Sequence, residues 1–315
     1  MNKYQTGTLK SSISRRIVTC LMATGLLIAL SPAVNAEENT LTWSGCGITK
    51  KAFMAEMAAA FEKKTGIMVK LKGGGATRGI REVANGSSAI GGSCRHVLVQ
   101  DSYTEKAHAA ERRINLDPVA WDPLVIIVHR SNPVNNITID QIRQIYTGKI
   151  TNWKQLGGNS AVIELYVRKG KISGVGRTLR ELVFANYEQV FTPRAHLVKS
   201  SGPLEKAVEG DVVNSIGITG NSSAKKRNVK VLTLNGKAPT IQNLTTGDYP
   251  LFRPLYLVTH QRNTSPNALK FKEFILSEEG RAVMRQAGTV PYGDGIGFWM
   301  KYLAIVRKAQ DYGLN

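Results

Sequence analysis

Several features that are common in enzymes and nucleic-acid-binding proteins are missing from this 315-residue sequence. Its five histidines are scattered without metal-ligand spacing, and no Gly-x-Ser-x-Gly, Walker A or His-Glu-x-x-His motif occurs. Aromatic residues make up only 7%, and no run of Lys and Arg is longer than Lys225-Lys226-Arg227. These absences disfavour a metal site, a hydrolase built on one of these motifs, and a nucleic-acid-binding surface.

Acidic residues are also few, with 23 Asp and Glu against 42 Lys and Arg, so the formal net charge is +19. Residues 1–36 contain four of the basic residues and no acidic one, which leaves +15 for the rest of the chain. Because long basic runs are absent, we interpret this charge as an electrostatic funnel for a small anion.

A single long apolar stretch, Ile17–Leu30, lies near the amino terminus. Basic residues precede it and Val34-Asn35-Ala36 follows it, which predicts a secretory signal peptide over residues 1–36. A membrane anchor is the alternative, but the stretch is short and no second one follows. We therefore expect an exported protein.

Cysteine is scarce, and only Cys46 and Cys94 remain after the predicted cleavage. Two cysteines in an exported protein can form a disulfide, whereas the alternative is a pair of buried free thiols. The sequence leaves both possibilities open.

Three segments show a strand pattern, a glycine-rich polar loop and a helix pattern in that order. The loops are Ser44–Gly47, Gly73–Gly79 and Arg168–Thr178, and the second helix is expected to open at Ile80. Such loops direct backbone N–H groups and the positive end of a helix dipole at one point, which suits an anion. The repeated order predicts an α/β fold with parallel strands and flanking helices.

Two isolated apolar runs, at 124–128 and 255–259, divide the chain into thirds. We interpret them as crossings between two lobes, with residues 37–120 and 255–315 in lobe I and residues 121–254 in lobe II. The ligand would then lie between the lobes at helix N-termini.

The ordered motifs of the chain resemble the phosphate-binding protein family of bacterial ABC importers. Ile145–Trp153, which reads IYTGKITNW, is the most diagnostic match. Further matches, in chain order, are Trp43–Cys46, Gly73–Gly79, Ile90–Arg95, Ala120–Asp122, Ser215–Gly220, Gly247–Leu251, Arg253–Leu255 and Gly288–Pro291.

The resemblance implies a periplasmic solute-binding protein of type II, with two lobes that each contain a mainly parallel sheet and are joined by two crossing strands. It implies no enzymatic activity and no cofactor. Its partners would be inorganic phosphate or a related tetrahedral oxyanion and an inner-membrane ABC permease, with no nucleic acid, and the protein would be a monomer.

In this family backbone N–H groups, hydroxyls and one arginine hold the anion. The resemblance carries these roles to Ser44, Gly45 and Cys46, to Ala76 and Thr77, and to Arg168, Ser173, Gly174 and Thr178. Arg95 and Arg177 are further candidates, and surface charges are the alternative for both. The resemblance also brings Cys46 and Cys94 to the same edge of one lobe.

Three departures from the family pattern affect the expected specificity. Ala76 stands where the family has serine, Ala89 stands where it has a carboxylate before the Ile-Gly step, and the third loop is longer. Asp122 is the candidate to replace the missing carboxylate. The ligand could therefore also be a phosphonate, a phosphate ester or another tetrahedral oxyanion.

Two other functions remain as alternatives at this stage. One is a secreted phosphatase or esterase that uses Ser44 or Ser173 as nucleophile, although the sequence shows no recognisable base beside either residue. The other is a secreted interaction protein that keeps the fold and uses its basic surface.

Overall fold

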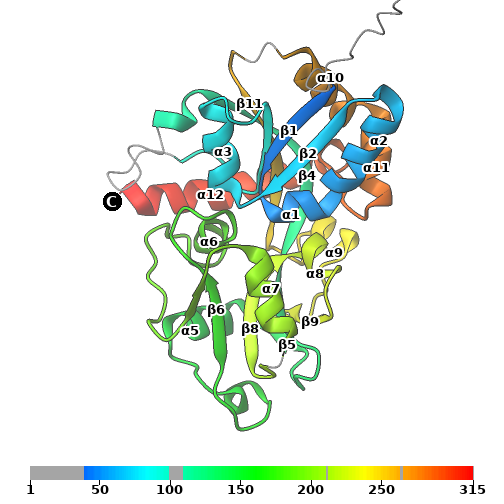
Figure 1. Ribbon diagram of the computed structural model, residues 1–315. Coiled ribbons are helices and arrows are strands. Elements are labelled where there is room, and N and C mark those ends of the chain that lie inside the picture. The colour runs from blue at the N-terminus through cyan, green and yellow to red at the C-terminus, as the bar shows by residue number, and fades with distance from the viewer. Residues whose placement is uncertain (1–38, 99–108, 211, 263–264, 315) are drawn as a thin grey trace, which may run out of the picture. The chain divides into compact units, whose positions relative to one another are not determined.

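The computed structural model describes residues 39–98, 109–210, 212–262 and 265–314, with only the backbone for 308–314. These residues belong to one compact unit, Ala36–Asn315 (Figure 1). The predicted signal peptide lies outside the described residues. None of the helices that the structure describes is long and apolar enough to cross a membrane.

A continuous path of paired strands, in the order β2-β1-β3-β11-β4-β8-β6-β7, forms the centre of the fold. The first part, sheet I, has parallel β1, β2 and β3 beside antiparallel β11, β4 and β12. The second part, sheet II, has parallel β6, β7 and β8 beside antiparallel β4 and β9. The strand bounds are β1 Thr40–Gly45, β2 Met68–Gly73, β3 Ile90–Ser93, β4 Ile114–His129, β5 Asn136–Ile137, β6 Glu164–Arg168, β7 His196–Val198, β8 Ser215–Gly220, β9 Val229–Val231, β10 Thr233–Leu234, β11 Phe252–His260 and β12 Val290–Pro291.

Strand β4 joins the two sheets. Its residues 114–123 pair with β11 in sheet I, and residues 124–128 pair with β8 in sheet II. Leu124–Val128 are completely buried, as expected for an apolar run covered on both faces. The second apolar run, 255–259, does not cross between the sheets. It belongs to β11, which pairs with β3 and with residues 114–123 of β4 and so lies entirely in sheet I.

Helices flank both sheets and begin where the parallel strands end. Their bounds are α1 Gly47–Thr49, η1 Lys50–Met54, α2 Ala55–Thr65, α3 Ala76–Ala84, α5 Ile139–Thr147, η2 Trp153–Leu156, α6 Gly174–Leu179, η3 Arg180–Phe184, α7 Ser201–Glu209, α8 Asn221–Ala224, α9 Ile241–Thr246, α10 Pro266–Leu276, α11 Glu278–Gln286, η4 Tyr292–Gly295 and α12 Phe298–Leu314. The segments α1, η1 and α2 form one continuous helical stretch, and so do α6 and η3.

Helix α3 begins four residues earlier than the sequence pattern indicated. Gly75 precedes it with φ +109°, a conformation that L side chains rarely adopt, and lets the chain turn directly into a helix at Ala76. The polar residues Thr77 and Arg78, which the sequence analysis assigned to the loop, therefore belong to the first turn of the helix.

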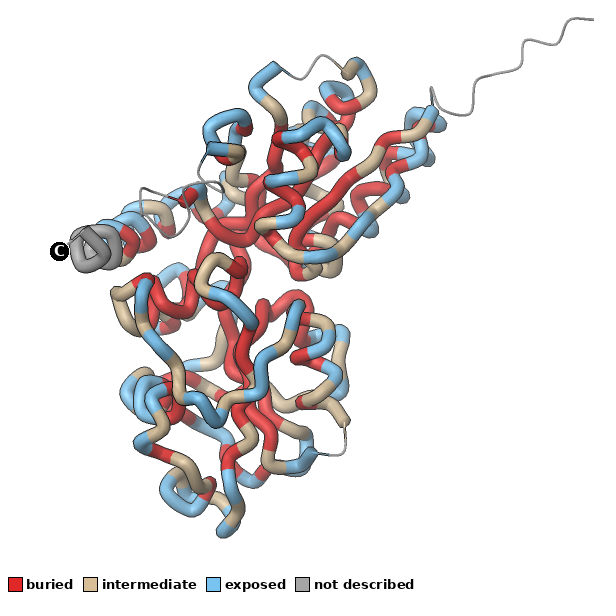
Figure 2. The backbone as a smooth tube through the Cα atoms, turned by 60° about the vertical axis from the view of Figure 1, so that its left-hand side comes forward, coloured by how far each residue is buried: buried red, intermediate tan, exposed pale blue. Residues whose placement is uncertain are grey.

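Helix α12 connects the two sides of the molecule. Its first residue, Phe298, packs on Trp121 and Phe252 of sheet I, with ring centroids 5.5 and 5.4 Å away. One turn later, the Tyr302 hydroxyl donates to Glu181 of η3, beside sheet II, at 3.3 Å. The buried residues follow the strands through both sheets (Figure 2).

Candidate functional site

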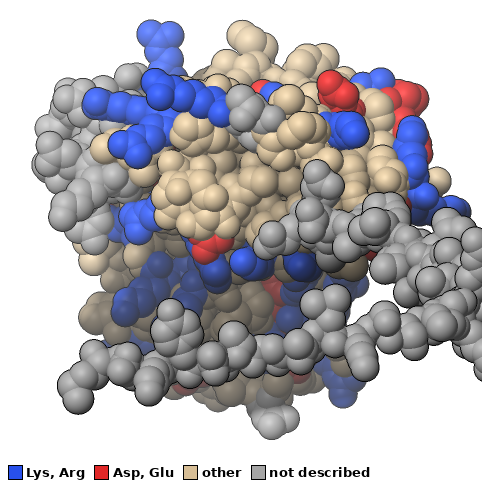
Figure 3. All heavy atoms as spheres, turned by 45° about the horizontal axis from the view of Figure 1, so that its top comes forward, with Lys and Arg blue, Asp and Glu red and all other residues tan. Residues whose placement is uncertain are grey.

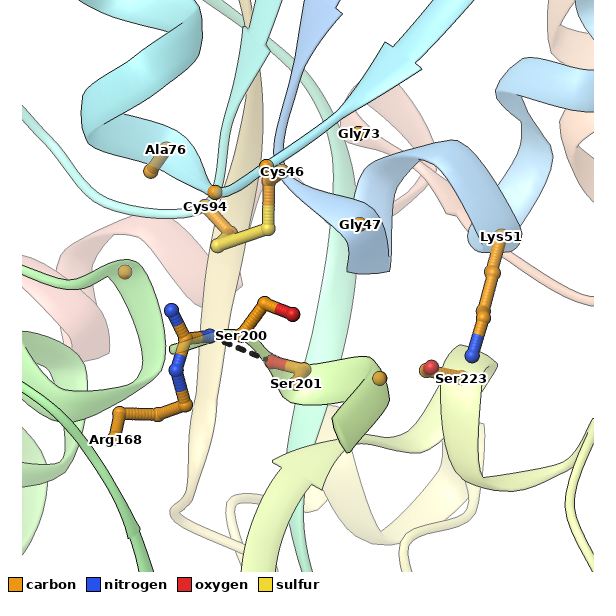
Figure 4. A pocket seen from close by; sticks show the side chains of 14 residues that line it. Cys46, Gly47, Lys51, Gly73, Ala76, Cys94, Arg168, Ser200, Ser201 and Ser223 are labelled. Carbon is orange, nitrogen blue, oxygen red and sulfur yellow. Dashed lines mark hydrogen bonds between the residues drawn. A yellow bond between two sulfur atoms is a disulfide. The ribbon is translucent and has the colours of Figure 1, made fainter. Parts of the chain in front are cut away.

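The residues that follow six parallel strands line one cavity of about 300 Å³ (Figure 4). These strands are β1, β2 and β3 of sheet I and β6, β7 and β8 of sheet II, and parallel α/β sheets place their binding sites at such carboxyl ends. The lining residues are Cys46, Gly47, Lys51, Gly73, Gly74, Gly75, Ala76, Cys94, Arg168, Gly174, Ser200, Ser201, Gly202 and Ser223.

Four helical stretches begin at this cavity. Their N-cap residues are Cys46 before α1, Gly75 before α3, Ser173 before α6 and Ser200 before α7. The first N–H groups of a helix have no partner within the helix, and its dipole places partial positive charge there. Converging helix starts therefore make the cavity electropositive and rich in hydrogen-bond donors, which suits an anion.

Arg168, the last residue of β6, supplies a full positive charge to the cavity. Its Nη1 donates to Ser201 Oγ at 3.0 Å and its Nη2 to the Lys199 carbonyl at 2.8 Å. Its Nε has no partner among the described residues, although the side chain is only 8% exposed. Burial lowers the pKa of Arg168 to about 10, so the guanidinium stays charged at neutral pH.

Cys46 and Cys94 form a disulfide in the cavity wall, with Cα atoms 6.1 Å apart. This confirms that the two cysteines lie close together and selects the paired alternative. The bond joins the start of α1 to the loop after β3. Gly174 packs against it from the sheet II side, where a Cβ would lie only 2.3 Å from Cys94 Sγ, so α6 can approach this closely only with glycine there.

Thr77 and Arg95 face the loop before α6 and are absent from the cavity lining. Thr77 Oγ1 and Arg95 Nε both donate to the carbonyl of Ile172, at 2.9 and 3.0 Å. Arg95 is also paired with buried Glu111 at 2.7 Å, and the guanidinium is almost fully buried. Arg95 is thus neither a surface charge nor a charge exposed to the cavity; it joins the loop after β3 to the loop before α6.

Asp122 lies in β4 and is also absent from the cavity lining. Its Oδ1 accepts from the backbone N–H and hydroxyl of Ser222 at 3.1 and 2.6 Å, and its Oδ2 lies 3.4 Å from Arg253 Nη2. Burial raises the pKa of Asp122, while Arg253 and the bonds from Ser222 act against that rise. The structure therefore gives this carboxyl a role in packing.

Ser44, Gly45 and Ser173 do not line the cavity but pack next to residues that do. Ser44 is completely buried in β1, and Gly45 packs against the backbone of Gly92. Ser173 caps α6 by accepting from the Gly176 N–H at 3.2 Å, and it donates to the Gly170 carbonyl at 3.3 Å. Its hydroxyl proton is thus directed at a carbonyl and away from any base.

Two residues of α6 make contacts behind the cavity. The Thr178 hydroxyl lies 2.9 Å from the Gly174 carbonyl and 3.3 Å from the Cys94 carbonyl. Arg177 is buried, and its guanidinium stacks 3.8 Å from the centre of the Tyr187 ring. The surface-charge alternative for Arg177 is therefore wrong.

Ala89 lies at the end of β3 that is farther from the cavity, so it cannot determine which anion binds there. It precedes the strand, whereas the cavity lies beyond the other end, at Cys94. Five residues of extended chain separate the two positions by about 16 Å. A carboxylate at position 89, where the resemblance assigns one to the family, would therefore not reach a ligand in this cavity.

Several lining residues were not expected from the sequence. Ser200 precedes α7, and Ser201 and Gly202 are its first two residues, so the strand, polar loop and helix order after β7 could have identified a fourth anion loop. Lys51 and Ser223 meet only through the buried carboxylate of Glu205, at 2.7 and 2.5 Å. Lys51 and Glu205 are 154 residues apart, so no local pattern signals their contact.

Lysines flank three of the cavity loops. Lys72 precedes Gly73, Lys169 follows Arg168, and Lys199 precedes Ser200, and all three side chains are exposed. We call this set the rim lysines. On the face that Figure 3 shows, blue Lys and Arg atoms outnumber red Asp and Glu atoms.

A second buried cluster joins three segments beside α12. Glu181 of η3 accepts from Tyr187 at 2.6 Å and Tyr302 at 3.3 Å, and its Oε1 lies 3.1 Å from His96 Nδ1. Burial raises the pKa of Glu181 to about 7 and lowers that of His96 to about 3. The other charged or titratable groups around the cluster include Arg95, Arg177, Arg253 and Tyr256.

Within the described part of the chain, no group of three or more His, Cys, Asp or Glu side chains could hold a metal ion. The arrangement around the cavity is suited to binding an anion by backbone N–H groups, hydroxyls and one arginine.

Comparisons with known proteins agree with this chemistry. A family model described as a PBP superfamily domain matches residues 33–279. The phosphate-binding protein PstS of Bacillus subtilis is 26% identical over 269 residues, covering 84% of this chain and 85% of that protein.

Two solved structures are also similar. The substrate-binding protein of a phosphate ABC transporter from Clostridium perfringens, solved with bound phosphate, is 28% identical with a TM-score of 0.69. The alignment covers 80% of this chain and 99% of that one. An ABC-type phosphate transport receptor from Vibrio cholerae is 27% identical with a TM-score of 0.59, covering 79% and 99%.

Proposed function

Because the chain belongs to the PBP superfamily, and within it to the phosphate-binding protein family, we propose that it captures phosphate in the cavity between its two sheets. The observation that carries this proposal is the buried guanidinium of Arg168, whose Nε faces no protein acceptor at the point where four helical stretches begin. A charged donor this deeply buried is costly unless an anion completes its hydrogen bonds.

Transport follows from the same family membership. The protein would bind phosphate in the periplasm after export and deliver it to an inner-membrane ABC permease, without catalysing a reaction. The phosphatase or esterase alternative receives no support from Ser173, whose hydroxyl caps a helix, nor from Ser44, which is completely buried.

We propose that the two sheets are the cores of two lobes, residues 37–120 with 255–315 and residues 121–254, with residues 121–123 of β4 and 252–254 of β11 at the boundary. Ligand capture would close them on each other. Closure would form contacts between the lobes of the kind already seen in the structure. These are the hydrogen bonds from Thr77 and Arg95 to the Ile172 carbonyl and the ion pair of Lys51 with Glu205.

Calorimetric titration of the purified protein with inorganic phosphate tests this function. We expect saturable binding of one phosphate, and Arg168→Ala should weaken it more than 100-fold because the buried positive charge and its open Nε donor are lost. Arg194→Ala is the matched control, since Arg194 is an exposed arginine of lobe II outside the cavity lining. Binding within a few-fold of wild type in Arg168→Ala would contradict the proposal.

A further inference from the structure

The cavity is larger than inorganic phosphate needs. A cavity of 300 Å³ offers room for roughly ten atoms the size of a water molecule, at about 30 Å³ each, whereas phosphate has five heavy atoms. Space therefore remains for further ligand atoms after phosphate has bound at Arg168.

The remaining space extends away from Arg168. Figure 4 shows Arg168 and Ser201 on one side of the cavity and Lys51 and Ser223 on the other, with the disulfide above. Arg168 and Ser201 are bonded to each other at 3.0 Å and form the charged end. A substituent on a phosphoryl group at that end would have the space beside Lys51 and Ser223 to occupy.

The far end presents polar groups but little net charge. Lys51 Nζ donates to Glu205 at 2.7 Å, and an ammonium group has two further protons to donate. Ser223 Oγ donates to the same carboxylate at 2.5 Å and can still accept a hydrogen bond. Glu205 pairs with both Lys51 and Arg227, and Glu209 pairs with Arg227, so these four charges balance and this end suits hydroxyl groups better than a second anionic group.

From these observations we infer that the cavity takes a phosphate monoester of a short polyol, a proposal that rests on the proposed phosphate-binding function. The phosphoryl group binds at Arg168 and the helix starts, and the polyol hydroxyls bond to Lys51 and Ser223. Inorganic phosphate enters the same site and leaves the far end to water.

Gly202 provides a position from which the cavity can be narrowed without changing Arg168, Lys51 or Ser223. It lines the cavity in the first turn of α7, and a Cβ built there meets no atom within 4 Å. Gly202→Leu therefore adds four carbon atoms to the cavity space without backbone strain. Gly297→Leu is the matched control, because Gly297 is exposed, has equal room for a Cβ, and does not line the cavity.

Calorimetric titrations with inorganic phosphate, sn-glycerol 3-phosphate and glycerol test the inference. In the wild type we expect a Kd for the ester no larger than that for phosphate, and no binding of glycerol alone. Gly202→Leu should raise the Kd for the ester at least tenfold more than the Kd for phosphate, while Gly297→Leu changes neither. Thermal unfolding of both variants checks that they are folded.

The outcomes separate the inference from the function on which it rests. A Kd for the ester larger than that for phosphate in the wild type, or an equal loss of both ligands in Gly202→Leu, overturns the inference and leaves phosphate capture intact. If neither phosphate nor the ester binds the wild type, the proposed function itself fails.

Discussion

At the scale of single residues, the geometry of the Arg168 fork matters as much as its charge. Lysine would keep the charge but cannot reach Ser201, Lys199 and a ligand oxygen with one planar group. We expect Arg168→Lys to weaken phosphate binding at least tenfold, less than Arg168→Ala does. Titration calorimetry on both variants checks this order, and equal affinities for the two would show that charge alone decides.

Asp122 and Ala89 give a second prediction, on specificity. Neither lines the cavity, so Asp122→Asn and Ala89→Asp should leave the ratio of phosphate to sulfate affinity unchanged. Asp122→Asn should also destabilise the protein by about 3 kcal/mol, because Arg253 would remain buried without its partner. Competition titrations and urea denaturation measure the two effects. A shift in the ratio in either variant would place that side chain within reach of the ligand.

At the scale of secondary-structure elements, the disulfide holds the start of α1 against the loop after β3. It spans 48 residues, and the chain-entropy model assigns such a loop about 4 kcal/mol of stabilisation. Cys46→Ser/Cys94→Ser should lose stability of this order and bind phosphate more weakly, since both positions line the cavity.

Guanidinium denaturation with and without a reductant checks the contribution of the disulfide. Reductant should destabilise the wild type to the level of the double variant and leave the double variant unchanged. Equal free energies of unfolding for the oxidised wild type and the double variant would contradict the expected stabilisation by the disulfide.

At the scale of the whole molecule, the cluster of Glu181 and His96 predicts a pH dependence of opposite sign for its two members. The pKa of Glu181 is raised in the fold to about 7, so its contribution to stability is present below about pH 4.5 and is lost as pH rises through 7. The pKa of His96 is lowered to about 3, so its contribution is present above about pH 6.5 and is lost as pH falls through 3. The two slopes oppose each other between pH 4.5 and 6.5.

Removing one member should therefore reveal the slope of the other. The stability of His96→Gln should fall by on the order of 3 kcal/mol as pH rises from 4.5 to 7, since only the contribution of Glu181 then remains. The stability of Glu181→Gln should instead rise as pH rises from 3 to 6.5, since only the contribution of His96 then remains. Denaturant unfolding at a series of pH values measures both slopes, and parallel curves for all three proteins would contradict the assignment.

Local order in the sequence was enough to predict the parts of the site that one loop builds. The order of strand, glycine loop and helix predicted the α/β fold and identified Arg168. This worked because the geometry of such a loop is set by residues that are adjacent in the sequence. The partners of Arg95 and Asp122 were missed, since Glu111 and Arg253 approach them only in the folded chain. Lys51 was missed for the same reason, and α3 was placed late because Gly75 adopts a positive φ that the sequence does not display.

The rim lysines have a consequence for the time course of capture rather than for its strength. Lys72, Lys169 and Lys199 are exposed and stand beside three cavity loops, so a phosphate ion meets their field before it touches any donor inside. Such a field raises the rate of encounter and weakens as salt screens it over about 10 Å at 0.1 M. Escape from the buried donors is screened much less, so the protein should catch its ligand more slowly in saltier surroundings while releasing it at nearly the same pace.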